Sequence, residues 1–314
     1  MIALCDGMGQ GESVRMPSRI APVGTAVLIA WAALTPALAY TASGDRLFPA
    51  TMVLPQLGPG DELYTNYNTL PLNGGGGAPT RTGSLTTTYM KSITDRFALS
   101  IEEGWTRLDA GPAGRQYGWQ NLDGELKFQA YNNLDHEFQI NLGLDRETGG
   151  TGAVRVGASP SGATTPRVYF GKGLGDLDIG FLRPLAVTGL AGVQIADSAP
   201  RPDVAVAGLV VEYSIPYLES KVASLDLPDW ARRLTPMTEV SFSAPAGTSF
   251  GARATALIAP GISYAGDGWE LGIEALLPMT RATGRGIGVT AQFHLSLDYL
   301  FADSVLGRPL VPGR

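Results

Sequence analysis

Between about Asp61 and Phe301, apolar and polar residues alternate in short segments that Gly, Pro, Asn and Asp separate. In the segment His136–Asp145, for example, Phe138 and Ile140 fall on one face while Gln139 and Asn141 fall on the other. A period of two predicts a β-strand with one apolar and one polar face. The same alternation recurs in Leu122–Tyr131, Glu239–Ala244, Gly268–Leu277 and Gln292–Phe301. The fold class is therefore expected to be all-β.

Two features of these strands favour a barrel with lipid outside and water inside. Carboxylates recur in the middle of the polar faces, and aromatic residues gather at strand ends, as in a barrel with interfacial girdles. The aromatic residues are Tyr64, Tyr67, Trp105, Trp119, Tyr213, Tyr217, Tyr264, Trp269, Tyr299 and Phe301. No apolar run after residue 40 approaches the roughly 20 residues of a spanning helix. We expect a transmembrane antiparallel β-barrel of about 12 strands; the alternative is a large soluble β-domain with its apolar faces inward.

The N-terminal segment 1–39 has the features of a secretory leader. Arg15 and Arg19 precede the apolar stretch Ala21–Leu34, and Ala37–Ala39 forms a small-x-small cleavage site. This order is typical of a signal peptide. Met16 is a plausible true start. Export and an all-β body together predict the cell outer membrane of a Gram-negative bacterium, with outer-membrane lipid and the barrel-assembly machinery as partners.

Charge and cysteine content exclude several functions. The net charge is −6 and no basic run occurs, which argues against a nucleic-acid partner. The one cysteine, Cys5, lies in the leader, so the mature chain is expected to hold neither a disulfide nor a thiolate zinc site. The chain has only two histidines and no Asp-rich loop, so the sequence shows no pattern typical of a metal site, and no cofactor is expected.

The rest of the chain divides into three parts. Residues 40–60 contain three prolines and are expected to form an extended arm, which either enters the lumen as a plug or hangs in the periplasm. Residues 61–301 are the expected barrel, and 302–314 a loose polar tail. The connectors Gly175–Pro184 and Leu225–Pro236 share the order Asp-Leu, aromatic, Arg, Pro, which predicts short periplasmic helices capped by Asp. Leu70–Ser84 is expected to be a long external loop.

The polar strand faces supply the candidate site, which consists of residues expected to line the lumen. They are Glu102, Glu125, Lys127, Glu137, Glu212, Glu239, Glu270, Glu274, His294 and Asp298. Buried charges need partners. One interpretation is a water-filled pore that favours cations, and the other is a salt-bridge network that fills a narrow barrel.

Several stretches resemble an uncharacterised family of proteobacterial outer-membrane proteins. They are Tyr169–Leu177, Leu182–Gly189, Glu212–Leu218 and Gly288–Leu295. That family is similar in type to the putative MetA-pathway transporters of phenol degradation. The resemblance covers about Tyr169 to Pro309 and implies a barrel that passes small molecules, hydrophobic or aromatic ones among them. It assigns no functional residue.

The sequence therefore predicts a channel or transporter for small solutes rather than an enzyme. The alternative is a structural or surface-interaction barrel whose lumen is filled by side chains. A third hypothesis is an outer-membrane hydrolase, because His294 and Ser296 share one strand face. A hydrolase needs those two groups within hydrogen-bond reach and an orienting carboxylate.

Overall fold

The computed structural model describes residues 41–73, 79–109, 114–199, 201–247 and 253–311. The predicted leader, 1–39, lies outside these residues.

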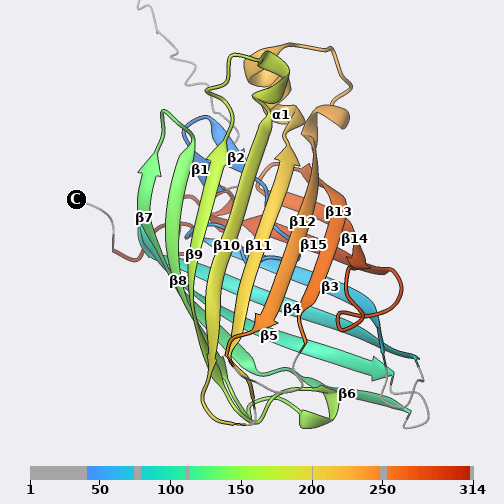
Figure 1. Cartoon of the computed structure of the whole chain (residues 1–314). Helices are drawn as coiled ribbons and strands as arrows, with labels where there is room; N and C mark the ends of the chain where they lie inside the picture. The colour runs from blue at the N-terminus through green and yellow to red at the C-terminus, as the bar shows by residue number, and fades with distance from the viewer. Residues whose placement is uncertain (1–40, 74–78, 110–113, 200, 248–252, 312–314) are drawn as a thin grey trace, which may run out of the picture. The chain divides into compact units, whose positions relative to one another are not determined.

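Twelve antiparallel strands close into a barrel (Figure 1), which confirms the expected fold class. Each strand pairs with its neighbour in the sequence, and β15 pairs with β3 from Val289↔Thr69 to Ser296↔Glu62 to close the ring. The strands are β3 (Glu62–Asn73), β4 (Pro79–Thr94), β5 (Phe97–Asp109), β7 (Leu122–Asn133), β8 (Phe138–Thr148), β9 (Ala163–Gly173), β10 (Leu185–Ala196), β11 (Val204–Tyr213), β12 (Leu234–Pro245), β13 (Thr255–Ala265), β14 (Trp269–Pro278) and β15 (Gly288–Ser296). The short strand β6 (Arg115–Trp119) pairs with the outer part of β5 and extends the line of β7.

The two faces of the wall have opposite polarity. Around the barrel, the outward side chains are large, apolar and exposed; examples are Ile101, Phe128, Leu142, Phe242 and Ile273. The inward side chains of the same strands are mostly polar and buried. A soluble β-domain places its apolar side chains inward, so this wall has the polarity expected in lipid.

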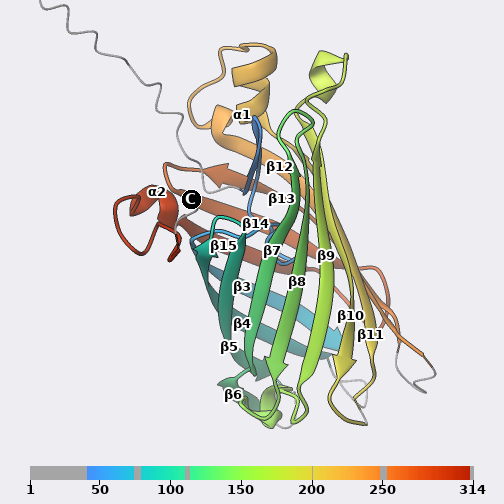
Figure 2. The ribbon, with the colours of Figure 1, turned by 90° about the vertical axis from the view of Figure 1, so that its left-hand side faces the viewer.

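Short helices cluster at one end of the barrel, as Figures 1 and 2 show. They are η4 (Gly180–Leu182), α1 (Ile215–Tyr217), η5 (Leu218–Val222) and η6 (Ala231–Arg233). The connectors predicted to be helical are therefore partly helical. The N-caps of η4 and η6 are Ile179 and Trp230, and neither forms a side-chain capping bond, so the expected Asp capping is wrong. Asp176 instead accepts a hydrogen bond from Lys172, which lowers the pKa of Asp176.

The N-terminal arm lies inside the barrel. It starts with the hairpin of β1 (Thr41–Ser43) and β2 (Arg46–Phe48), near the end that carries α1 (Figure 1). Gly44 turns this hairpin with φ of 62°, and a Cβ there would lie 2.1 Å from the Leu134 carbonyl oxygen. Residues 49–60 then run through the lumen, so of the two open possibilities the structure shows the plug.

Two boundaries differ from the sequence-based expectation. Strand β3 continues to Asn73 and strand β4 already begins at Pro79, so most of the expected loop Leu70–Ser84 is strand. At the C-terminus, β15 ends at Ser296 and α2 (Leu297–Leu300) follows. Residues 302–311 return to β4, where the N–H of Val311 donates to Ile93 at 2.8 Å. The described part of the tail is thus docked rather than loose.

Candidate functional site

Eight of the ten predicted lumen residues lie on the inner face of the wall. Seven are nearly inaccessible, with exposed fractions of 0 to 6%, and these are Glu125, Lys127, Glu212, Glu239, Glu270, Glu274 and His294. Glu102 is partly exposed to an internal cavity described below. Their inward orientation follows from strand alternation, because their sequence neighbours occupy the outer face.

Glu137 and Asp298 lie elsewhere than expected. Glu137 precedes β8 in a tight turn, with a φ of 47°, and its buried carboxylate closes the helical end of the barrel. Asp298 is exposed in the first turn of α2, where its Oδ1 accepts the N–H of Tyr299 at 2.8 Å. Extending the strand alternation past Ser296 placed Asp298 in the lumen, and the change from strand to helix moves it out.

The carboxylates of the wall hold the backbone of the arm. Glu239 accepts hydrogen bonds from three successive N–H groups, those of Met52, Val53 and Leu54, at 2.6, 3.2 and 2.8 Å. Glu270 accepts the N–H of Ala50 at 3.3 Å. A carboxylate that receives several backbone donors forms strong, charge-assisted hydrogen bonds. These lumen residues therefore dock the arm.

Donors on the wall bind the carbonyl groups of the arm. Lys127 Nζ donates to the Gln56 carbonyl at 2.5 Å, and Asn141 Nδ2 donates to the Leu57 carbonyl at 3.0 Å. Across the barrel, Gln292 Nε2 donates to the Thr51 carbonyl at 2.7 Å. The arm thus spans the lumen between β7–β8 and β15.

The arm also fits the wall by shape. Its apolar side chains pack with residues of β9 to β12 in one buried cluster, formed by Phe48, Met52, Leu54, Leu57, Tyr169, Ala186, Leu190, Val210 and Met237. Three wall glycines leave space for this packing. A Cβ at Gly208 would lie 2.5 Å from Leu54, and one at Gly171 or Gly272 would lie 2.6 Å from Leu57 or Met52. Any larger residue at these positions would push the arm away.

Arg46 fastens the hairpin at the helical end. Its side chain is fully buried, and its Nε donates to Glu137 at 3.2 Å. Its other nitrogens bind the carbonyls of Arg183, Pro184 and Leu185, and its guanidinium lies 4.0 Å from the ring centroid of Tyr217. Burial, together with the hydrogen bond to Glu137, raises the pKa of the Tyr217 hydroxyl. This end of the lumen is closed by a connected group of charged and aromatic side chains.

A cavity of about 270 Å³, here called the chamber, lies between the arm and the inner face of the wall. Arm residues 52–55 form one wall, and inward residues of β3, β4, β5, β7, β8 and β9 form the others. The strand residues are Tyr64, Asn66, Asn68, Thr86, Thr88, Ser100, Glu102, Asp123, Gly124, Glu125, Asp145 and Arg167. The lining carries four carboxyl groups and one guanidinium group.

Two of these carboxyl groups already have cationic partners. Arg167 lies 3.1 Å from Asp145, and Lys127 lies 3.3 Å from Glu125, which also accepts the Tyr169 hydroxyl at 2.5 Å. Glu102 accepts the Thr88 hydroxyl at 2.7 Å, and Asp123 lies beside Asp145. Among the described residues, neither Glu102 nor Asp123 has an ion pair. The chamber is therefore acidic.

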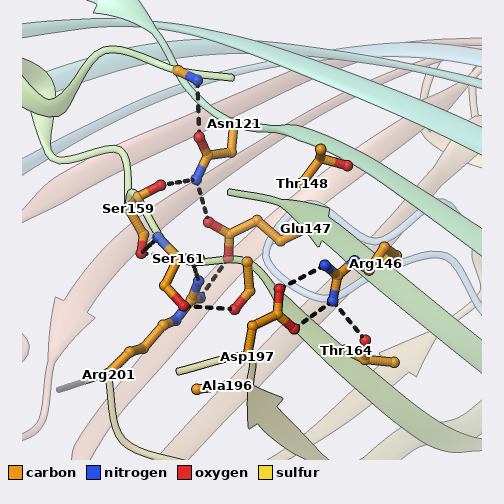
Figure 3. Close-up of polar contacts among 12 residues, drawn as sticks. Asn121, Arg146, Glu147, Thr148, Ser159, Ser161, Thr164, Ala196, Asp197 and Arg201 are labelled. Atoms are coloured by element: carbon orange, nitrogen blue, oxygen red, sulfur yellow. Dashed lines mark hydrogen bonds and ion pairs between the residues drawn. The ribbon is translucent and has the colours of Figure 1, made fainter. Parts of the chain in front are cut away.

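The loop 149–162 is fixed at the end of the barrel opposite the helices by the contacts in Figure 3, here called the rim cluster. Arg146 forms two hydrogen bonds of 2.6 Å with Asp197, and these bonds lower the pKa of Asp197. Arg201 binds Glu147 and the Ser161 carbonyl. Asn121 Nδ2 donates to Glu147 at 2.6 Å and to the Ser159 carbonyl at 2.8 Å. Asp145 of the chamber and Glu147 of the rim cluster are two residues apart on β8 and share one strand face, while Arg146 lies on the opposite face.

The geometry does not favour the hydrolase hypothesis. His294 and Ser296 are both buried inside the barrel, and no hydrogen bond joins them. His294 Nε2 lies 3.3 Å from Glu62, while Ser296 donates its hydroxyl to Asp298. Both side chains also point away from the lipid-facing surface.

Sequence reasoning missed several residues of the site. Asp123, Asp145 and Arg167 lie on polar strand faces, so a fuller reading of the alternation finds them. Arg46 and the three wall glycines carry no local signal, because their role depends on contacts with distant segments.

The described residues contain no cluster of three or more His, Cys, Asp or Glu side chains arranged to hold a metal ion. Among them there is also no helix of the length and hydropathy needed to cross a membrane.

No family model and no curated protein matches the chain. Among solved structures, the chain is similar to an outer-membrane channel from Pseudomonas putida F1, with a TM-score of 0.52 and 12% identity over 80% of this chain and 99% of that one. The KdgM porin matches with a TM-score of 0.46 and 11% identity over 75% of this chain and 98% of that one. LpxR from Salmonella typhimurium matches with a TM-score of 0.40 and 10% identity over 74% of this chain and 99% of that one. At this identity, the likeness to the Pseudomonas channel shows a shared barrel fold.

Proposed function

We propose that this chain is an outer-membrane channel for small molecules, and that its own N-terminal arm closes the lumen at rest. The observation that carries the proposal is that the ring of twelve strands closes without the arm. The lumen is thus blocked by a separate segment rather than by the wall itself. A segment of this kind can leave the lumen while the barrel stays intact.

The nature of the arm's contacts supports this proposal. The turn at residues 51–56 is braced internally, because Thr51 and Gln56 exchange hydrogen bonds of 3.2 and 2.9 Å. Its contacts with the wall are hydrogen bonds and side-chain packing, which can break and form again. The arm can therefore move as one piece.

Two further observations support a location in the outer membrane. The outward wall is apolar and exposed, and the fold is shared with a solved outer-membrane channel. The predicted leader supplies a route of export. Outer-membrane lipid and the barrel-assembly machinery are then the expected partners.

The class of solute remains a prediction. The resemblance to MetA-pathway transporters implies hydrophobic or aromatic compounds. The chamber, however, is lined mainly by hydroxyl, amide and carboxyl groups, which favour polar solutes.

A disulfide that locks the arm tests the proposal in the full chain. A Cβ at position 208 would lie 3.1 Å from Leu54 Cγ, so Leu54→Cys with Gly208→Cys brings the Cβ atoms within reach of the roughly 3.5–4.5 Å found in disulfides. The mature chain is expected to hold no other cysteine. In planar bilayers, the reduced protein should show channel openings when the arm leaves the lumen, and the oxidised protein should stay closed. Leu54→Cys alone, under the same oxidant, is the control.

Gly208→Leu provides a second variant, because its side chain fills the space of Leu54 and should hold the arm out of place. It is expected to conduct more than the unmodified chain. If folded Gly208→Leu and the reduced double variant both pass no ions, the channel proposal fails and a structural barrel with a filled lumen is favoured. If oxidation changes nothing in a conducting protein, the arm is not the gate.

A further inference from the structure

The chamber has the size and the walls of a small-ligand site. Its volume of about 270 Å³ is close to the lower end of the roughly 300–1,000 Å³ typical of such sites. Its walls come from the arm and from six strands of the closed sheet, and the sheet fixes the strand walls.

The charges in the chamber call for a cation. Glu102 and Asp123 face the cavity without an ion pair among the described residues, while Glu125 and Asp145 are already paired. An enclosed carboxylate group is stabilised by a positively charged partner nearby.

A second feature, independent of charge, also indicates a ligand. The side-chain oxygen Oδ1 of Asn66, which lines the chamber, is buried and has no hydrogen-bond partner among the described residues. Buried polar groups are usually paired with protein, water or ligand. Asn66 shares one face of β3 with Tyr64 and Asn68, so its side chain faces the same space as Glu102.

The other lining groups suit an organic cation better than a bare metal ion. Asn66, Asn68 and Thr86 offer neutral donors and acceptors, and Tyr64 offers an aromatic ring. Carboxyl groups beside an aromatic ring suit an ammonium group, through ion pairing and cation–π attraction. No cluster suited to a metal ion occurs among the described residues.

We propose that the chamber binds a small organic cation, an amine or a quaternary ammonium compound, with Glu102 and Asp123 as its anionic partners and Asn66 as a hydrogen-bonding group. The proposal rests on the proposed function in that the bound cation would be a solute of the channel. The ligand would touch arm residues 52–55, the segment that closes the lumen.

Choline is a suitable probe because 3,3-dimethylbutan-1-ol has nearly the same shape without the charge. Saturation-transfer NMR on the folded barrel in detergent, in a mildly alkaline buffer, reports binding of each compound directly. Choline should bind and the neutral alcohol should bind far more weakly.

The variant Glu102→Gln with Asp123→Asn should weaken choline binding by at least about tenfold, or about 1.4 kcal/mol, because it removes both anionic partners of the trimethylammonium group. Glu103→Gln is the matched control, because it removes the same charge from the next residue, on the outer face of β5. Glu102→Gln alone replaces the double variant if the latter does not fold.

Equal binding of choline and the alcohol, or equal loss in Glu103→Gln, would overturn the proposal. Binding is measured without passage, so the two proposals fail separately. Choline binding by a barrel that never conducts would leave the chamber as a binding site and reject the channel. Conduction without choline binding would support the channel and reject the chamber as a site for organic cations.

Discussion

At the scale of single residues, Arg46 shows how strongly the lumen depends on one side chain. Its guanidinium is fully buried, and its partners come from the turn before β8 and from the connector between β9 and β10. The planar guanidinium presents five N–H donors in a fixed fork, whereas an ammonium group has three on a single nitrogen. Arg46 therefore joins the arm to two separate parts of the barrel.

Arg46→Gln should release the arm. It leaves Glu137 buried without its cation, and loss of one partner of a buried pair costs about 3–5 kcal/mol. The expected results are a lower melting temperature by circular dichroism and faster trimming of the arm by proteinase K. Arg46→Lys should be intermediate, because it keeps the charge but loses most of the hydrogen bonds.

Arg233→Gln is the matched control for Arg46→Gln. Arg233 pairs with Asp267 at 2.8 Å, but both side chains are exposed, and such pairs contribute about 0–1 kcal/mol. If the two substitutions destabilise the protein equally, Arg46 does not anchor the arm.

At the scale of elements, the loop 149–162 is held by the ends of neighbouring strands. The rim cluster links β8, the segment after β10 and this loop through Arg146, Asp197 and Arg201 (Figure 3). Loops at a strand end are usually mobile unless such bonds fix them. We expect the cluster to keep this loop in place at the end of the barrel.

The hydrogen bonds from Arg146 lower the pKa of Asp197 below its ordinary value of 3.8. A lowered pKa in the folded state stabilises that state above the ordinary pKa, and the contribution disappears as the pH falls through the lowered pKa. The rim cluster should therefore persist through mildly acidic pH. Carbon-detected NMR titration of the Asp197 carboxyl group measures this directly.

In Arg146→Gln, the pKa of Asp197 should return toward 3.8, and the loop should become more accessible to protease at neutral pH. If the pKa of Asp197 is the same in Arg146→Gln as in the unmodified protein, the ion pair between Arg146 and Asp197 does not form in solution.

At the scale of the whole molecule, closure of the sheet is the dominant feature. Every strand of the ring has two neighbours, so no open edge remains, and the polar groups of the backbone are paired around the full circle. A closed ring with an apolar exterior must open cooperatively, because each strand is held on both sides.

The barrel should therefore be heat-modifiable. Unheated protein in dodecyl sulfate is expected to keep its fold and to migrate differently on a gel from boiled protein. Outer membranes from cells that express the chain provide the sample, and the soluble periplasmic fraction is the control. Identical migration before and after boiling, with the protein in the soluble fraction, would contradict a membrane barrel.

The sequence alone determined the strands, their two faces and the approximate size of the barrel. These follow from a period of two, which is a local property that neighbouring residues carry themselves. Eight of the ten candidate residues, such as Glu239 and Glu270, lie on the inner wall because the same alternation orients them.

Only the tertiary structure decided what the inner wall binds. Arg46 meets Glu137 across 91 residues, and Gly208 makes room for Leu54 from a distant strand. The chamber likewise exists only where six strands and the arm meet. Such contacts join segments that the chain brings together when the barrel closes, and no local pattern records them.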